Sequence, residues 1–233
     1  MASRKIFIPN KENIGVIEKQ IDFQWYSGVS VIQKQKSVQS LHDVCRCLGI
    51  ENILEISTKS FDLLGQKLSA FNLMTMLPNT NKKITVEAAF QGSKVFEKSG
   101  PYTDIYEKSS FEAKKDIRLK ISGNLCSFNF CGQKFGITPK TFFYDWLYIN
   151  ALFQHKDYLE QIKKFNAFTD IEFNDVKSIN CQARTVALSV SLLYNNVSLD
   201  CIESPDEFYN VVKKYYGDNE TNNNRLIQGS FAF

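Results

Sequence analysis

The spacing of apolar residues along this chain is the feature that most constrains its fold. Val38, Leu41, Val44 and Leu48 lie three or four positions apart, and Gly49 follows as a natural helix terminator. Similar patterns predict helices over residues 61–68, 85–96, 109–119, 141–153, 158–165, 178–194 and 205–216. A capping box at the start of 109–119 supports that helix. We therefore expect a protein built mostly from helices.

Short stretches of alternating apolar and polar residues interrupt this pattern and predict a few strands. Ile21–Tyr26 and Leu125–Phe130 alternate in this way, and Asn52–Ile56 is a further short candidate. Gly132-Gln133 turns the second stretch into a β-hairpin. No internal repeat and no clear linker is present, so the simplest prediction is a single α+β domain.

The two ends of the sequence look less regular than its middle. Residues 1–20 read as an irregular arm, residues 21–216 as the domain, and residues 217–233, rich in Asn and Gly, as a mobile tail. Met1–Pro9 is too short and too charged for a secretory signal, and no apolar run approaches the roughly 20 residues of a membrane span. We expect a cytoplasmic protein that makes no membrane contact.

Composition is that of a globular protein with a sizeable core. Hydrophobic residues make up 43% of the chain and charged residues 23%. The net charge of +3 permits contact with nucleic acid without implying it, because the basic residues are interspersed with acidic ones. A local basic face remains compatible with this balance.

Cysteine and histidine positions do not suggest a metal site. The six cysteines contain no Cys-x-x-Cys pair, and His42 and His155 lack the spacing of metal ligands. We expect reduced, mostly buried cysteines, no metal and no cofactor. The sequence also lacks a Walker loop, a dinucleotide fingerprint and a Ser-His-Asp set.

Two polar segments in the first half of the chain could present groups to a ligand. Ser57–Ser60 follows a predicted strand, where a loop can offer side chains and amides; a solvated turn is the plainer reading. Glu87, Gln91 and Lys94 have the spacing i, i+4, i+7, which places them on one face of the predicted helix. The alternative for this face is an exposed stripe of ion pairs.

Two further polar segments lie later in the chain. The basic cluster in Glu112–Arg118 could hold a pyrophosphate or a nucleic-acid backbone, although such a run is more often a solvated face. Thr169–Asn174 and Ser178–Arg184 lead into an apolar helix whose N-terminus could bind an anion. Ser178 could equally be a plain N-cap. These residues alone predict a polar cleft and no specific reaction.

Taken in order, these segments resemble the NADAR superfamily. Leu68–Leu73 is similar to its Leu-Ser-Asn-Phe element, Val86–Phe96 to its Val-Glu-x-x-Phe-Gln-x-x-Lys-Phe helix, and Ser110–Lys114 with Arg118 to its Ser-Pro-x-Glu-Ala-Lys element. Ser178–Asn180 is similar to the closing Gly-x-Asn element. The resemblance covers residues 20–195.

Longer phrases resemble a narrower branch, the antitoxin partners of DarT-type toxins, which attach ADP-ribose to DNA bases. These phrases are Ala89–Glu97, Phe143–Tyr148 and Ser178–Ala183. The chain departs from the wider family at two positions: Ala70 stands where Asn is usual, and Thr169 stands near a position that often holds Trp. An aromatic contact to the ligand would then come from elsewhere.

The resemblance implies cleavage of the N-glycosidic bond between a ribose and a guanine base, without a cofactor. It assigns catalytic roles to Glu87, Lys59, Lys94 and Asp170. Ligand contacts would come from Ser69, Phe71, Asn72, Phe90, Gln91, Arg118, Asn180, Gln182 and Arg184. The implied partners are ADP-ribose or ADP-ribosylated nucleic acid and a DarT-type toxin.

Other functional classes remain open at this point. The protein could bind ADP-ribosylated nucleic acid or sequester a toxin without turnover, or it could hydrolyse a free nucleotide metabolite. An enzyme requires the implied residues to converge on one cleft. The aromatic segment that contains Phe142, Phe143, Trp146, Leu147 and Ile149 is expected to form a core helix face instead.

Overall fold

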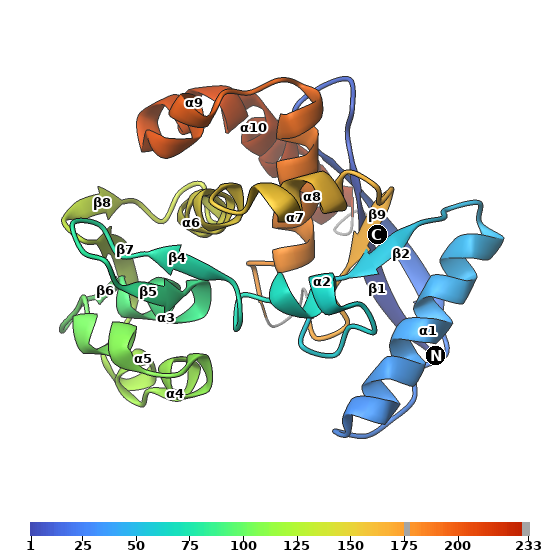
Figure 1. Ribbon diagram of the computed structural model, residues 1–233, viewed down its shortest axis with the longest axis horizontal. Coiled ribbons are helices and arrows are strands. Elements are labelled where there is room, and N and C mark those ends of the chain that lie inside the picture. Colours follow the sequence, from blue (N-terminus) through green and yellow to red (C-terminus); the bar gives the residue numbers. More distant parts are fainter. Residues whose placement is uncertain (175–177, 230–233) are drawn as a thin grey trace.

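The computed structural model describes residues 1–174 and 178–229, the stretch 218–229 as helical backbone only. Its strands are β1 (Ala2–Pro9), β2 (Val16–Phe23), β3 (Ile53–Glu55), β4 (Met74–Met76), β5 (Lys83–Thr85), β6 (Lys94–Phe96), β7 (Leu125–Phe130), β8 (Gln133–Phe135) and β9 (Ala167–Thr169). Its helices are α1 (Val31–Cys47), α2 (Leu63–Lys67), α3 (Val86–Gly92), the 3-10 helix η1 (Thr103–Glu107), α4 (Ser110–Lys115), α5 (Arg118–Ile121), α6 (Phe142–Phe153), α7 (Lys156–Ile162), α8 (Gln182–Tyr194), α9 (Leu199–Glu203) and α10 (Pro205–Gly229). The predicted α+β class is confirmed (Figure 1).

A four-stranded sheet in the order β2-β1-β9-β3 has helices packed on both faces. On one face Ile6 and Ile21 contact Val38 and Leu41 of α1 in one apolar cluster. On the other face Phe7 belongs to the large core cluster that contains α6 and α8. Successive side chains of a strand point to opposite faces, so β1 can supply both clusters.

The predicted irregular arm is wrong. Residues 2–9 and 16–23 form an antiparallel hairpin, paired from Ala2↔Phe23 to Pro9↔Val16. Phe7 then pairs with Phe168 of β9, which binds the hairpin to the middle of the sheet. Partners this distant in sequence leave no signal in the local pattern of residues 1–20.

Several predicted helix boundaries also need correction. The segment 85–96 contains the short helix α3 and then strand β6, and the helix expected from residue 109 ends at Lys115. Helix α8 begins at Gln182 rather than at Ser178. Helix α10 has Gly229 as its last residue, beyond Tyr216, where we expected it to end. Residues 175–177 and 230–233 lie outside the described part of the chain.

The aromatic helix α6 lies in the core, as predicted. Phe143, Leu147 and Ile149 are buried, whereas Phe142 and Trp146 are half-buried and pack against the same cluster. The Trp146 indole donates a hydrogen bond to the Ile202 carbonyl at 3.1 Å. Within the described residues, no helix has both the length and the apolar character needed to cross a membrane.

Candidate functional site

Helix α3 presents a buried carboxylate and a buried carboxamide side by side. Thr85 caps the helix, and every residue of α3 is buried, including Glu87 and Gln91. Gln91 Nε2 donates to Glu87 Oε1 at 2.9 Å, which fixes the orientation of the carboxamide. Gln91 Oε1 points the other way and has no hydrogen-bond partner within the described part of the chain. A buried acceptor of this kind is suited to a ligand hydroxyl.

Lys94 joins this pair from a strand and not from the helix. Ser93 ends α3, and Lys94 pairs with Phe128 at the start of β6. Its Nζ lies 4.7 Å from the centre of the Phe90 ring. Burial lowers the pKa of Lys94 to about 8, with the charge of Glu87 opposing the shift. Glu87, Gln91, Phe90 and Lys94 therefore share one environment.

The loop after α2 and helix α4 form one border of this environment. Phe71 is half-buried, and the Lys114 ammonium lies 5.0 Å above its ring. Ser110 Oγ donates to the Phe71 carbonyl at 2.8 Å. The Glu87 amide donates to the Ala70 carbonyl at 2.9 Å, which joins this loop to α3.

Gln182 is a junction between segments rather than a free ligand contact. Its Oε1 accepts from the Ala70 amide at 2.8 Å, and its Nε2 donates to the Ile56 carbonyl at 2.7 Å. It also hydrogen-bonds Asp170. Because protein groups occupy both ends of this carboxamide, we reassign Gln182 from ligand binding to positioning. Nearby in sequence, Asn180 Oδ1 is buried and has no partner among the described residues.

Two buried carboxyl groups lie at the carboxyl ends of the parallel strands β3 and β9: Glu55 is the last residue of β3, and Asp170 follows β9. Glu55 Oε2 accepts from the Thr169 hydroxyl at 2.6 Å and Glu55 Oε1 from the Ile171 amide at 2.8 Å. Asp170 Oδ1 accepts from the amides of Glu172 and Phe173. Burial raises the pKa of Asp170 well above its usual range, and the charge of Glu55 adds to the shift. Asp170 is therefore a candidate proton donor.

Tyr144 on α6 is near enough to Glu87 and Asp170 for both charges to act on it, and the sequence did not single it out. Burial raises the pKa of its hydroxyl well above the usual range, and the charges of Glu87 and Asp170 contribute to the shift. Tyr144 occurs in a phrase of the antitoxin branch, but its aromatic spacing favoured a core role.

A comparison with known proteins identifies the family of the chain. A family model described as DarT1-associated NADAR antitoxin matches residues 2–222. The chain belongs to this family. The match begins within β1, so the N-terminal hairpin lies inside the matched region. No curated protein matches the chain.

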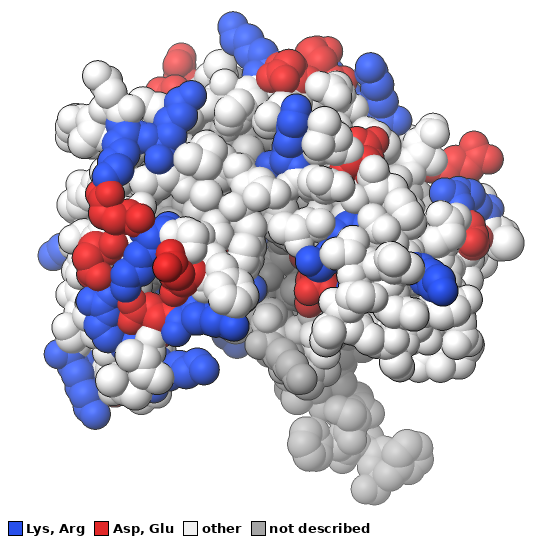
Figure 2. Space-filling view, turned by 60° about the horizontal axis from the view of Figure 1, so that its bottom comes forward, with Lys and Arg blue, Asp and Glu red and all other residues white. Residues whose placement is uncertain are grey.

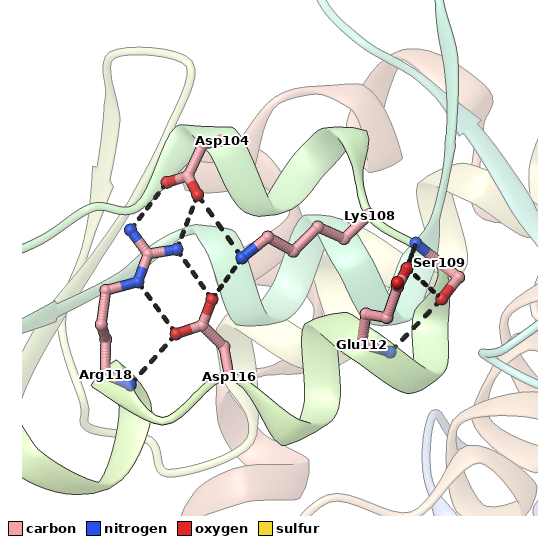
Figure 3. Close-up of polar contacts among 6 residues, drawn as sticks. All are labelled: Asp104, Lys108, Ser109, Glu112, Asp116 and Arg118. Carbon is pink, nitrogen blue, oxygen red and sulfur yellow. Dashed lines mark hydrogen bonds and ion pairs between the residues drawn. The ribbon is translucent and has the colours of Figure 1, made fainter.

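Arg118 of this NADAR antitoxin already has carboxylate partners. Its guanidinium donates to Asp116 at 2.9 and 2.7 Å and to Asp104 at 3.0 and 2.6 Å (Figure 3). Both pairs of bonds have the fork geometry that a phosphate would otherwise use. The structure therefore gives Arg118 a local structural role in place of the expected pyrophosphate contact.

Arg184 is also engaged by protein groups. It is 8% exposed and donates to Asp145 Oδ2 at 2.8 Å, in a buried cluster that includes Tyr216. Asn72 is exposed, and its carboxamide donates to the Gln66 carbonyl at 2.8 Å. We remove Arg184 and Asn72 from the candidate site because Arg184 Nη2 and the Asn72 carboxamide donate to protein groups, although Arg184 Nε has no partner among the described residues.

Ser69 and Lys59 have weaker links to the site of the NADAR antitoxin. Ser69 is buried and accepts from the Phe71 amide at 3.4 Å, so it shapes the loop that carries Phe71. Lys59 is half-buried in the loop after β3, and no contact joins it to Glu87 in the described part of the chain. In that part, no group of three or more His, Cys, Asp and Glu residues could hold a metal ion.

Proposed function

We propose that this NADAR antitoxin is a glycohydrolase that removes ADP-ribose from nucleic-acid bases, with guanine in DNA as its substrate. It would reverse the modification made by a DarT1-type toxin in the cytoplasm. The observation that carries the proposal is the buried Glu87–Gln91 pair, in which Gln91 Oε1 remains an unused acceptor. A ribose hydroxyl could donate to this oxygen while its ring lies beside the carboxylate.

The reaction breaks the bond between ribose C1″ and a base nitrogen. The breaking bond leaves positive charge on the ribose, which the Glu87 carboxylate stabilises. Water then adds to C1″ and loses a proton, so that free ADP-ribose and the unmodified base are released. Gln91 and Asn180 supply acceptors for ribose hydroxyls.

The departing base takes a proton from Lys94 in this proposal. Burial lowers the pKa of Lys94 to about 8, which makes its ammonium a better acid than an exposed lysine while it stays protonated at neutral pH. Asp170 is the second candidate, because burial keeps it protonated. Tyr144, whose hydroxyl stays neutral, can donate a hydrogen bond to the ribose or the base.

The test is to incubate the purified protein with single-stranded DNA that carries ADP-ribose on guanine. We expect free ADP-ribose and unmodified DNA in a yield that exceeds one equivalent of protein. Tight binding without release would favour a binding module instead. Protection only when a DarT1-type toxin is present, through a stable complex, would favour sequestration of the toxin.

A further inference from the structure

Two of the acidic groups around α4 and α5, Asp104 and Asp116, are paired with basic groups of the same cluster. Asp104 and Asp116 bind Arg118, and Lys108 also contacts both aspartates. Glu112 is held in the capping box by Ser109 (Figure 3). Glu112 keeps its negative charge, so the remaining lysines of the cluster outnumber its one carboxylate that lacks an ion pair in the described part of the chain.

The remaining lysines are exposed. Lys114, Lys115 and Lys120 lie on the solvent side of α4 and α5, and none of them forms an ion pair with any residue that the structure describes. Figure 2 shows basic and acidic side chains crowded together on one side of the view, next to a hollowed part of the surface. The local excess of positive charge is compatible with an anionic polymer, although the net charge of the whole chain is only +3.

Aromatic rings accompany these lysines. Phe111 is 60% exposed, and Lys115 Nζ lies 3.9 Å from the centre of its ring. Lys114 Nζ lies 5.0 Å from the centre of the Phe71 ring. We call Phe71, Phe111, Lys114, Lys115 and Lys120 the lysine–aromatic surface. An exposed phenylalanine beside free lysines combines a stacking group with phosphate-binding groups.

The lysine–aromatic surface is continuous with the candidate site. Ser110 at the start of α4 bonds the Phe71 carbonyl, and α4 packs along α3, which carries Glu87 and Gln91. Lys114 is close enough for its charge to act on Lys94. A nucleic-acid strand that places one nucleotide beside Glu87 can therefore continue over Phe71 towards Phe111.

We propose that the lysine–aromatic surface binds the single-stranded nucleic acid that flanks the modified nucleotide. Lys114, Lys115 and Lys120 contact phosphates, and Phe111 stacks on a base. A paired base inside a duplex does not offer its face to a side chain, so stacking selects an unpaired strand. This inference rests on the proposed function for the identity of the modified nucleotide, whereas binding of an unmodified strand can be measured independently.

The test uses an unmodified, fluorescently labelled single-stranded DNA of about 12 nucleotides, within the range of known single-strand sites. Binding is measured by anisotropy over a range of salt concentrations. In the double variant K114A/K115A, the slope of log Kd against log salt should fall by about 1.4, or about 0.7 for each lost phosphate contact. Phe111→Ala should weaken binding about tenfold and leave the slope unchanged.

The matched control is K213A/K214A, which removes another exposed pair of adjacent lysines, on α10. It should bind the strand as the wild type does, and K213A/K214A and Phe111→Ala should bind free ADP-ribose as the wild type does. Equal slopes for K114A/K115A and the wild type would overturn the proposal. The proposal would also be overturned if duplex DNA of the same sequence bound as tightly as the single strand and Phe111→Ala did not change the affinity.

The two proposals fail in different ways. If the lysines and Phe111 control strand binding but no ADP-ribose is released from modified DNA, the lysine–aromatic surface stands and the glycohydrolase proposal fails. The second case is measured with a modified oligonucleotide at subsaturating concentration. If K114A/K115A and Phe111→Ala both release ADP-ribose from it at the wild-type rate, the glycohydrolase proposal stands and the surface proposal fails. A single-stranded RNA of the same sequence measures whether the sugar affects binding.

Discussion

At the scale of single residues, Lys94 brings its ammonium from β6 to the Glu87–Gln91 pair of α3. The i, i+4, i+7 pattern grouped Lys94 with Glu87 and Gln91, and the structure does bring them together. The reason is different from the one expected, because Lys94 belongs to β6 and reaches the site after the helix has ended. The strand depends on pairing with β7, more than 30 residues later in the chain.

Lys94 also gives the account a testable pH dependence. As a proton donor it is active while protonated, so kcat/KM should fall as the pH rises through about 8. Lys94→Arg keeps the charge but cannot release a proton to the base, so Lys94→Arg and Lys94→Met should both lose most of the activity. The profile is measured by release of ADP-ribose from modified DNA. An activity that rises through pH 8 would instead indicate attack by the neutral amine.

At the scale of elements, α2 and β3 show how a glycine fits two segments together. A Cβ on Gly65 would lie 2.0 Å from the Glu55 carbonyl oxygen and 2.4 Å from Ser60 Oγ. Gly65 lies inside the helix predicted over residues 61–68, and a close approach between backbones has no local pattern that would reveal its role. The glycine therefore allows α2 to pack directly on the strand that leads to the Ser57–Ser60 loop.

Gly65→Ala should destabilise the protein although alanine is the better helix former. The helix preference favours alanine by about 1 kcal/mol, but the clash with backbone should cost about 1–3 kcal/mol or more. Gly217→Ala in α10 is the matched control, because a Cβ there meets nothing within 4 Å. Urea unfolding should give a lower midpoint for the first variant and an equal or higher midpoint for the second. A Gly65→Ala protein as stable as the wild type would contradict this packing.

Several elements were predictable because their signals are local. The capping box of Ser109 and Glu112 is present, and so is the hairpin of β7 and β8. The N-terminal hairpin was missed because its position depends on β9 and on Ser191, whose hydroxyl donates to the Asn10 carbonyl at 2.6 Å. Tyr144 was missed for a related reason, since a core aromatic and a site aromatic have the same spacing.

At the scale of the whole molecule, Asp145 connects the helices that surround the site. It is fully buried, and Arg184, Thr185 and Tyr216 donate to it at 2.8, 2.6 and 2.9 Å. These contacts join α6, α8 and α10. Because α6 carries Tyr144 and α8 begins at Gln182, the network also sets the relative positions of groups in the candidate site.

Asp145→Asn should be among the most destabilising single changes in the protein. It leaves the Arg184 charge buried without its counter-charge, which typically costs about 3–5 kcal/mol. Asp104→Asn is the comparison: its side chain is 56% exposed, and the loss should be about 1 kcal/mol or less. Chemical denaturation of both variants provides the measurement. Equal losses would show that the buried pair contributes no more than a surface bridge.

The most direct test of the account is single-turnover cleavage of ADP-ribosylated DNA by Glu87→Gln. This change keeps the shape of the side chain, and Gln91 retains an acceptor within reach. The account predicts unchanged stability and ADP-ribose binding, with a rate of bond cleavage lower by about a hundredfold or more. Cleavage at the wild-type rate would contradict it, make Glu87 structural, and leave Lys59, Lys94 and Asp170 as the remaining candidates.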